Sequence, residues 1–163
     1  MEYVYLGRIT NTHGLKGEIR IRSNFKYKDK VFRKGFVLYI GSSKVKEVIN
    51  SYRPHKEYDM VTLLGIDDIE EVLKYKGSLV FINKDDLNLG TNEYVFEDYI
   101  SCKCYFNNKE IGIVDTIVDS GNGNYLFVLD NGKYIPKNDN FIERLDLENK
   151  KLYLKNLEGL IWE

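Results

Sequence analysis

Apolar and polar residues alternate with a period of two through many short segments of this chain. The clearest case is a segment in which Ile19 and Ile21 alternate with Arg20 and Arg22. Successive side chains of a β-strand point to opposite faces. We therefore expect a strand here that buries one apolar face and presents two guanidinium groups on the other.

A glycine-containing turn is expected between this strand and an apolar strand close to the N-terminus. It covers residues 11–14, and Gly17 follows it after two further residues. Gly14 and Gly17 indicate a backbone that needs a positive φ or a close approach at two points. The loop displays His13 and Lys16. Two interpretations remain open, a contact surface and an ordinary corner of a β-barrel.

Turn signals recur at short intervals through the rest of the chain. Short strands separated by such turns, with few helices, predict an all-β protein built as a small barrel or sandwich. Pro136 marks the end or edge of a strand. The turns lie at residues 41–43, 107–108, 121–124, 130–133 and 149–150.

One short helix is expected near residues 67–76. Asp67 or Asp68 is positioned to cap its first turn, and Gly77 is positioned to end it. Its apolar face is formed by Ile69, Val72 and Leu73.

A polar segment at residues 85–93 predicts a linker, with one domain at 1–84 and a second at 94–163. An aromatic and acidic run that contains Tyr94 and Phe96 follows it at once. These aromatic side chains either anchor an interdomain seam or a protein partner, or pack into a core.

Two stretches of the first domain combine cations with aromatic or polar residues. Residues 25–34 alternate lysines and arginines with aromatic side chains, which fits either phosphate and base contacts or a solvated cover over a barrel end. Residues 51–58 contain Arg53 and His55 and are expected to form a surface loop.

The formal net charge of −1 conceals an uneven distribution along the sequence. Residues 1–56 hold 13 Lys/Arg and 4 Asp/Glu, whereas residues 57–163 hold 11 Lys/Arg and 21 Asp/Glu. This split predicts two surfaces for two kinds of partner, the basic one suited to phosphate-rich polymers. Chance clustering on solvated faces is the alternative.

Several chemistries are not expected. Cys102 and Cys104 are two residues apart, which suits small apolar strand residues in a reducing compartment better than a disulfide. A metal site is not expected, because a zinc site usually needs four ligands and the chain has only two histidines. No cofactor is expected. A hydrolase or nuclease using His13 or His55 would need an acid–base partner, and neither histidine has one in a recognisable motif. The longest apolar runs are too short to span a membrane, so a soluble, cytoplasmic protein is expected.

An ordered set of short motifs over nearly the whole chain resembles the bacterial ribosome maturation factor RimM family. The segment 13–18 is by itself a moderately specific signature of this family. The whole set of motifs, in this order, is a strong one. The motifs are Gly7-x-Ile9, residues 13–18, Arg53, residues 64–68, Gly77, Asp98, Ile111-Gly112-x-Val114, Ile135-Pro136, residues 141–142, 145–147 and 158–160.

The resemblance implies two small β-barrels, the first like those of translation factors and the second a PRC-barrel. It further implies a non-enzymatic protein that binds the immature small ribosomal subunit and small-subunit ribosomal protein nineteen and supports processing of 16S rRNA. The family often has two adjacent aromatic residues where this chain has Tyr94 and Val95.

We therefore expect a monomeric assembly chaperone with two binding surfaces. The RNA-binding residues would be His13, Lys16, Arg20, Arg22 and Arg53, and the protein-binding residues would be Tyr94, Phe96 and Asp98. A free-standing RNA-binding barrel without a protein partner is the main alternative function.

Overall fold

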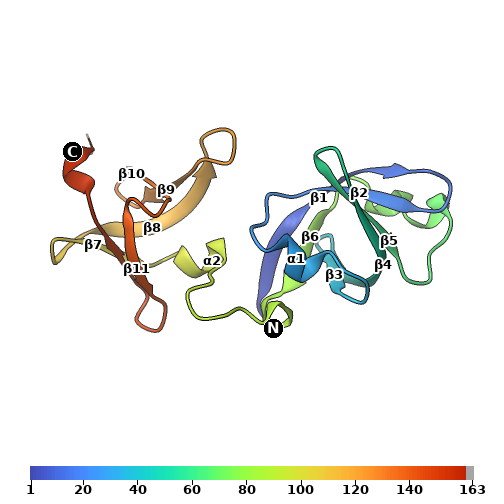
Figure 1. Ribbon diagram of the computed structural model, residues 1–163, viewed down its shortest axis with the longest axis horizontal. Coiled ribbons are helices and arrows are strands. Elements are labelled where there is room, and N and C mark those ends of the chain that lie inside the picture. The colour runs from blue at the N-terminus through green and yellow to red at the C-terminus, as the bar shows by residue number, and fades with distance from the viewer. Residues whose placement is uncertain (161–163) are drawn as a thin grey trace. The chain divides into compact units, whose positions relative to one another are not determined.

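The computed structural model describes residues 1–160 and divides the chain into two compact units, Met1–Glu93 and Tyr94–Glu163. Each unit has its own β-sheet (Figure 1). The prediction of a mainly β protein with two sheet domains is confirmed.

Six strands of the first unit close into a barrel in the order β1-β2-β5-β4-β3-β6. All neighbouring pairs are antiparallel, so the closed sheet leaves no exposed edge. The inward side chains are the isoleucines, valines and leucines that the period-two pattern places on one face. The elements are β1 (Tyr3–His13), β2 (Glu18–Arg22), α1 (Lys28–Val31), β3 (Val37–Ile40), β4 (Val45–His55), β5 (Tyr58–Leu63) and β6 (Leu79–Asn83).

Strand β1 bends around the barrel through two register shifts. One lies between Tyr5 and Gly7 in the pairing with β6, and the other lies between Ile9 and Asn11 in the pairing with β2. Such bulges increase the local twist and bend a strand. A Cβ atom on Gly7 would lie 2.4 Å from the carbonyl oxygen of Arg22, so the close approach of β1 to β2 requires glycine there.

Two segments expected to be loops belong to strands. Strand β1 continues through residues 11–13, and the turn lies at residues 14–17 instead. Strand β4 continues to His55, which leaves only residues 56–57 between β4 and β5. The ladder with β5 explains the second difference, because Arg53 pairs with Met60 and His55 pairs with Tyr58.

The single helix expected over residues 67–76 is replaced by two 3-10 turns, η1 (Ile69–Glu71) and η2 (Leu73–Tyr75). Asp68 caps the first, and its side chain accepts a hydrogen bond from the amide of Glu70 at 3.0 Å. The amide of Ile69 donates to the carbonyl of Leu15 at 3.0 Å, which ties this segment to the β1–β2 turn. The expected apolar face is broken, because Leu73 is 45% exposed.

The cationic segment at residues 25–34 covers the barrel core. Tyr27, Val31 and Phe32 are buried, and the Phe32 ring stacks on Tyr52 at 5.1 Å between centroids. Helix α1 lies within this segment. Of the two interpretations of its aromatic residues, the structure favours core packing for these three.

Residues 84–93 remain attached to the first unit. The turn η3 (Lys84–Leu87) follows β6 directly and buries Leu87. The ammonium group of Lys30 donates to the carbonyl of Asn88 at 3.4 Å and lies 3.5 Å from the carboxylate of Glu93. The segment predicted as a linker is therefore held against α1 by one lysine.

The second unit is a six-stranded sheet in the order β10-β9-β8-β7-β12-β11. Strands β12 and β7 pair in parallel, and the other pairs are antiparallel. The elements are α2 (Phe96–Tyr99), β7 (Lys103–Phe106), β8 (Lys109–Asp119), β9 (Tyr125–Leu129), β10 (Tyr134–Pro136), β11 (Ile142–Asp146), β12 (Lys151–Leu154) and the 3-10 turn η4 (Leu157–Gly159).

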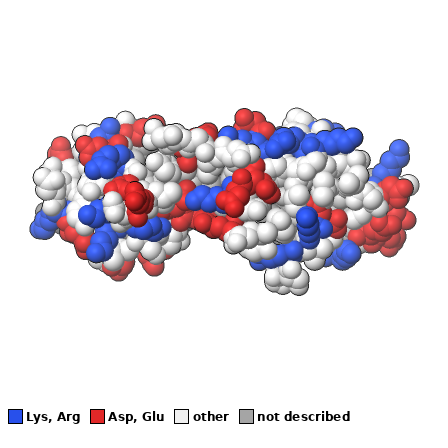
Figure 2. Space-filling view, turned by 90° about the horizontal axis from the view of Figure 1, so that it is seen from below, with Lys and Arg blue, Asp and Glu red and all other residues white. Residues whose placement is uncertain are grey.

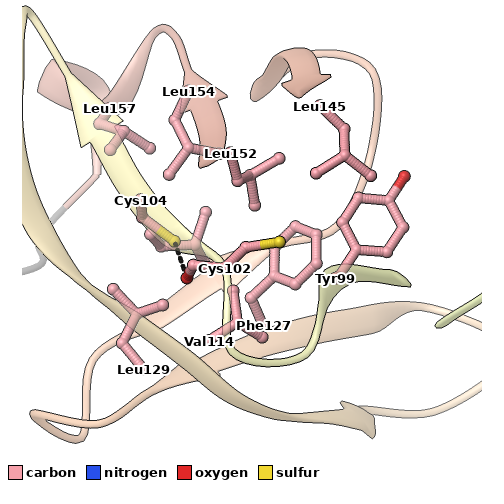
Figure 3. Packing of buried hydrophobic residues seen from close by; sticks show 11 residues of the cluster. Tyr99, Cys102, Cys104, Val114, Phe127, Leu129, Leu145, Leu152, Leu154 and Leu157 are labelled. Carbon is pink, nitrogen blue, oxygen red and sulfur yellow. Dashed lines mark hydrogen bonds between the residues drawn. The ribbon is translucent and has the colours of Figure 1, made fainter. Parts of the chain in front are cut away.

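Figure 3 shows the core of this unit, with Phe127 and Tyr99 facing leucines from β11, β12 and η4. Cys102 and Cys104 lie among these side chains as buried free thiols. Burial raises the pKa of Cys104 to about 12, so this thiol stays protonated and unreactive at neutral pH. Both cysteines behave as small core residues.

Candidate functional site

Four polar residues from three strands meet at one side of the barrel. His13 and Glu18 pair across β1 and β2, and His55 of β4 places its ring 6.4 Å from that of His13. Arg53, also of β4, donates two hydrogen bonds to the carboxylate of Glu18, at 2.8 and 2.9 Å. The structure thus brings together the predicted site residues His13 and Arg53.

The bidentate contact fixes the charges of this cluster. Hydrogen bonding from Arg53 lowers the pKa of Glu18 and outweighs the effect of its partial burial, and the nearby histidines act in the same direction. The same contact raises the pKa of Arg53. Glu18 is therefore held as an ionised acceptor, which suits orientation of Arg53 better than general acid chemistry. Arg53 remains 48% exposed, so its outer side can meet an anion.

Arg20 lies on the same outer face as Arg53. Both residues pair with Met60 of β5, Arg20 from β2 and Arg53 from β4, so the three form one row across the sheet. The guanidinium carbon of Arg20 lies 4.9 Å from the centroid of the Tyr58 ring, which orients the side chain by a cation–π contact. Its buried Nε has no hydrogen-bond partner among the described residues.

Arg22 is the neighbour of an arginine that the sequence analysis missed. Arg8 of β1 stands directly opposite Arg22, and both are exposed. Arg8 donates to the carbonyl of Gly77 at 3.3 Å, and Arg22 lies 3.6 Å from the carboxylate of Glu57 in a solvent-exposed contact. Directly opposed like charges destabilise a strand pair. The period-two pattern that identifies Arg20 and Arg22 does not identify Arg8, because the register shift between Tyr5 and Gly7 interrupts that pattern in β1.

We call Arg8, Arg20 and Arg22 the arginine face. Lys16 lies apart from them in the exposed turn at residues 14–17. A row of oriented guanidinium groups can bind successive phosphates of a nucleic acid backbone.

The predicted protein-binding residues lie around α2 in the second unit. Asp98 is 3% exposed, and its carboxylate accepts a hydrogen bond of 2.9 Å from the amide of Val95. Asp98 thus fixes the turn that carries the neighbouring aromatic side chains and does not reach the surface. The Tyr94 ring packs at 6.1 Å from that of Tyr99, and its hydroxyl donates to the carbonyl of Leu145 at 3.4 Å.

Phe96 occupies a different position from Tyr94. Its ring meets Tyr125 edge-to-face at 4.8 Å, and the ammonium group of Lys137 lies 4.8 Å from its centroid. The ring is half-buried, so part of it remains available to a partner. Of the two interpretations of the aromatic run, core packing applies to Tyr94 and Tyr99, whereas Phe96 retains contact surface.

The charge split at residue 56 does not follow the two units. It falls in the turn between β4 and β5, within the first barrel. Counted by unit, residues 1–93 hold 16 Lys/Arg and 13 Asp/Glu, and residues 94–163 hold 8 and 12. On the face shown in Figure 2, both signs of charge occur over both units. The first unit is therefore only mildly basic, so its attraction for phosphate must come from particular groups of cations and not from its net charge.

Within residues 1–160, no three His, Cys, Asp or Glu side chains are grouped as a metal site. None of the helices in this described part is both long and apolar enough to cross a membrane.

Comparison with known proteins gives consistent matches over the chain. The RimM N-terminal domain family matches residues 4–87, and the RimM PRC barrel domain family matches residues 96–160. Ribosome maturation factor RimM of an Exiguobacterium species is 31% identical over 168 residues, covering 99% of this chain and 98% of that protein. Its counterpart in Staphylococcus haemolyticus is 35% identical over 164 residues, covering 97% and 98%.

A solved N-terminal domain of RimM from Thermus thermophilus is 22% identical, with a TM-score of 0.47, and covers 57% of this chain and 100% of that one. The two matched domains follow one another in the order of the two structural units. The full-length relatives and both domain matches show that the chain belongs to the RimM family.

Proposed function

We propose that this protein is a non-catalytic ribosome assembly factor that binds the immature small ribosomal subunit and supports processing of its 16S rRNA. The relatives named as ribosome maturation factors cover nearly the whole chain, which supports the general role. The juxtaposition of Arg8 and Arg22 on the arginine face carries the RNA-binding part of the proposal.

Like charges placed directly opposite one another reduce the stability of the barrel, and a bound phosphate relieves that repulsion. Arg20 extends the row, and the cation–π contact with Tyr58 holds its side chain in place. Phosphate contacts of this kind supply affinity and salt dependence, and they carry little sequence information. His13, Lys16 and Arg53 would contribute further contacts from the adjoining rim.

The second unit would bind small-subunit ribosomal protein nineteen. Phe96 offers an aromatic anchor, Asp98 fixes the turn that carries it, and Tyr94 would add half-buried aromatic surface beside it. The negative balance of this unit favours encounter with a basic protein. Binding an immature arrangement of the subunit more tightly than the mature one would bias assembly by differential affinity, and no chemical step is needed.

The decisive test is charge reversal on the arginine face. The variant Arg20→Glu plus Arg22→Glu should bind small-subunit precursor particles about tenfold or more weakly at low salt and should show a shallower dependence of log affinity on log salt. Filter binding or fluorescence anisotropy at several salt concentrations measures both quantities.

A matched control changes the total charge equally at another part of the first unit. Lys34→Glu plus Lys46→Glu alters two exposed lysines that lie before β3 and within β4, outside the arginine face, and should change the affinity by less than about threefold. Equal losses in the two variants would show that net charge alone governs binding. Unchanged affinity of the arginine variant would exclude this surface from RNA binding.

A further inference from the structure

The outer face of the sheet in the second unit carries a row of stacked side chains. Tyr105 of β7 and Tyr153 of β12 are register partners, and their rings stack with centroids 5.6 Å apart. Arg144 of β11 pairs with Tyr153 from the other side and places its guanidinium carbon 3.9 Å from the ring centroid. Lys151 lies 5.5 Å from the Tyr105 ring. Three neighbouring strands thus form one cation–aromatic row.

These side chains point away from the core. Figure 3 shows that Cys104, Leu152 and Leu145, the neighbours of Tyr105, Tyr153 and Arg144 along their strands, all face the core of the unit. Because side chains alternate along a strand, the tyrosines and the arginine lie on the opposite, outer face. The alternation of Tyr153 between Leu152 and Leu154 in the sequence places Tyr153 on this face, but the row itself depends on pairing between strands that are distant in sequence.

A hollow of about 640 Å³ adjoins the two tyrosines. Its lining combines an aromatic wall with amides and charges of both signs. The lining residues are Tyr105, Phe106, Asn107, Asn108, Glu143, Tyr153, Leu154, Lys155, Asn156 and Glu158.

The geometry points to a binding site for an unpaired nucleotide of RNA on this face. A nucleobase packs against the Tyr105 ring and the edge of the Tyr153 ring, because Tyr105 and Arg144 cover the two faces of Tyr153. Flanking phosphates meet Lys155 in the hollow and Arg144 beside it. Base–aromatic contacts and arginine planes are the usual means of holding single-stranded RNA. Nothing in this assignment depends on the arginine face of the first unit or on a protein partner of the second.

The carboxylates of the hollow indicate which bases fit. Glu143 and Glu158 can accept hydrogen bonds from exocyclic amino groups, and the side-chain amides of Asn107 and Asn108 can meet the polar edge of a base. Uracil lacks an exocyclic amino group, so cytosine is the better pyrimidine ligand.

The negative balance of the second unit makes long-range attraction for RNA weak there. Affinity must therefore come from base contacts, and it should depend on salt less steeply than binding to the arginine face does. This difference separates the two sites experimentally.

The test uses the whole 163-residue chain with Arg20→Glu and Arg22→Glu, which should remove RNA binding by the arginine face. Three fluorescently labelled RNA hexamers serve as probes: oligocytidine, oligouridine and an abasic ribose-phosphate chain. Oligocytidine should bind most tightly. Tyr105→Leu plus Tyr153→Leu should weaken oligocytidine binding about fivefold or more. Tyr105→Phe plus Tyr153→Phe should retain it, because the rings remain.

Tyr134→Leu removes a tyrosine that is 57% exposed on β10 of the same unit and should leave binding unchanged. If the double leucine variant has a lower melting temperature than the parent, Arg144→Met plus Lys155→Met replaces it and should weaken binding to a similar degree. Equal affinity for the abasic chain, or for oligouridine, would overturn the assignment. So would a variant that loses affinity for a ribosomal protein while its RNA affinity is unchanged, because the surface would then belong to a protein partner.

Discussion

At the scale of single residues, the contact between Glu18 and Arg53 decides how much positive charge the barrel rim can offer. Arg53 donates two hydrogen bonds to one carboxylate, and that carboxylate offsets part of the positive charge of Arg53. An exposed ion pair of this kind contributes about 1 kcal/mol or less to stability. Its main effect is therefore on orientation and on affinity for anions.

Replacing Glu18 by Gln should increase RNA affinity about twofold to tenfold at low salt, because one negative charge is removed beside Arg53 while the shape is kept. Titration of labelled rRNA fragments at two salt concentrations measures the change, which high salt should diminish. Glu2→Gln removes a carboxylate that pairs with Lys84 and serves as the matched control. An affinity that falls in Glu18→Gln would mean that Arg53 needs its partner in order to contact RNA.

The same pair predicts a pH dependence of stability. The lowered pKa of Glu18 means that its stabilising contribution is present above the ordinary value of about 4.5 and is lost as the pH falls through the lower folded-state pKa. The urea-unfolding free energies of the wild type and Glu18→Gln should therefore differ most near neutral pH and converge in acid.

At the scale of elements, the period-two pattern predicts strands wherever one face is buried, and it fails where both faces are polar. The ends of β1 and β4 carry His13, Arg53 and His55 at the rim of the barrel, where strand pairing and the contact between Arg53 and Glu18 hold them in the sheet. The segment at residues 67–76 shows the opposite error, because its local pattern predicts a regular helix that does not form. Its apolar spacing is typical of a helix, but the hydrogen bond from Ile69 to Leu15 ties it to a turn that is distant in sequence.

For the same reason, the candidate site was only partly predictable. The alternation in β2 identifies Arg20 and Arg22 directly. Their juxtaposition with Arg8, and the grouping of His13 with His55, depend on strand pairing that no local pattern contains. The burial of Asp98 likewise follows from a hydrogen bond within its own turn.

The β1–β2 turn and η1 should unfold together. Gly17 has φ +83°, and a Cβ atom there would lie 3.1 Å from the carbonyl oxygen of Asp68, whereas Gly14 has φ +71° and open space around it. Ala at either position is strained, because a residue with a Cβ atom is disfavoured at positive φ. In Gly17→Ala the new Cβ atom also crowds the backbone at the start of η1. Gly17→Ala should therefore destabilise the first unit by about 1 kcal/mol more than Gly14→Ala in urea unfolding. It should also speed amide exchange at Ile69, and equal effects of the two variants would show that the contact adds nothing.

At the scale of the whole molecule, the two units carry small net charges of opposite sign, and we propose that they bind different partners. Because both signs of charge are distributed over each unit, partner choice must depend on particular groups: the arginine face in the first unit and Phe96 in the second. Two binding surfaces that share no residue should contribute independently to affinity.

This independence can be tested with variants of the full-length protein. Phe96→Ala should weaken capture of small-subunit ribosomal protein nineteen by about tenfold, since it removes an aromatic anchor, and should leave affinity for 16S rRNA fragments unchanged. Arg20→Glu plus Arg22→Glu should do the reverse. For precursor particles that present both partners, the combined variant should lose the sum of the two free energies to within about 0.5 kcal/mol. Tyr134→Ala is the control for loss of an exposed ring in the second unit. A combined loss well below that sum would show that RNA and protein meet one shared surface, and the division of labour between the units would then be wrong.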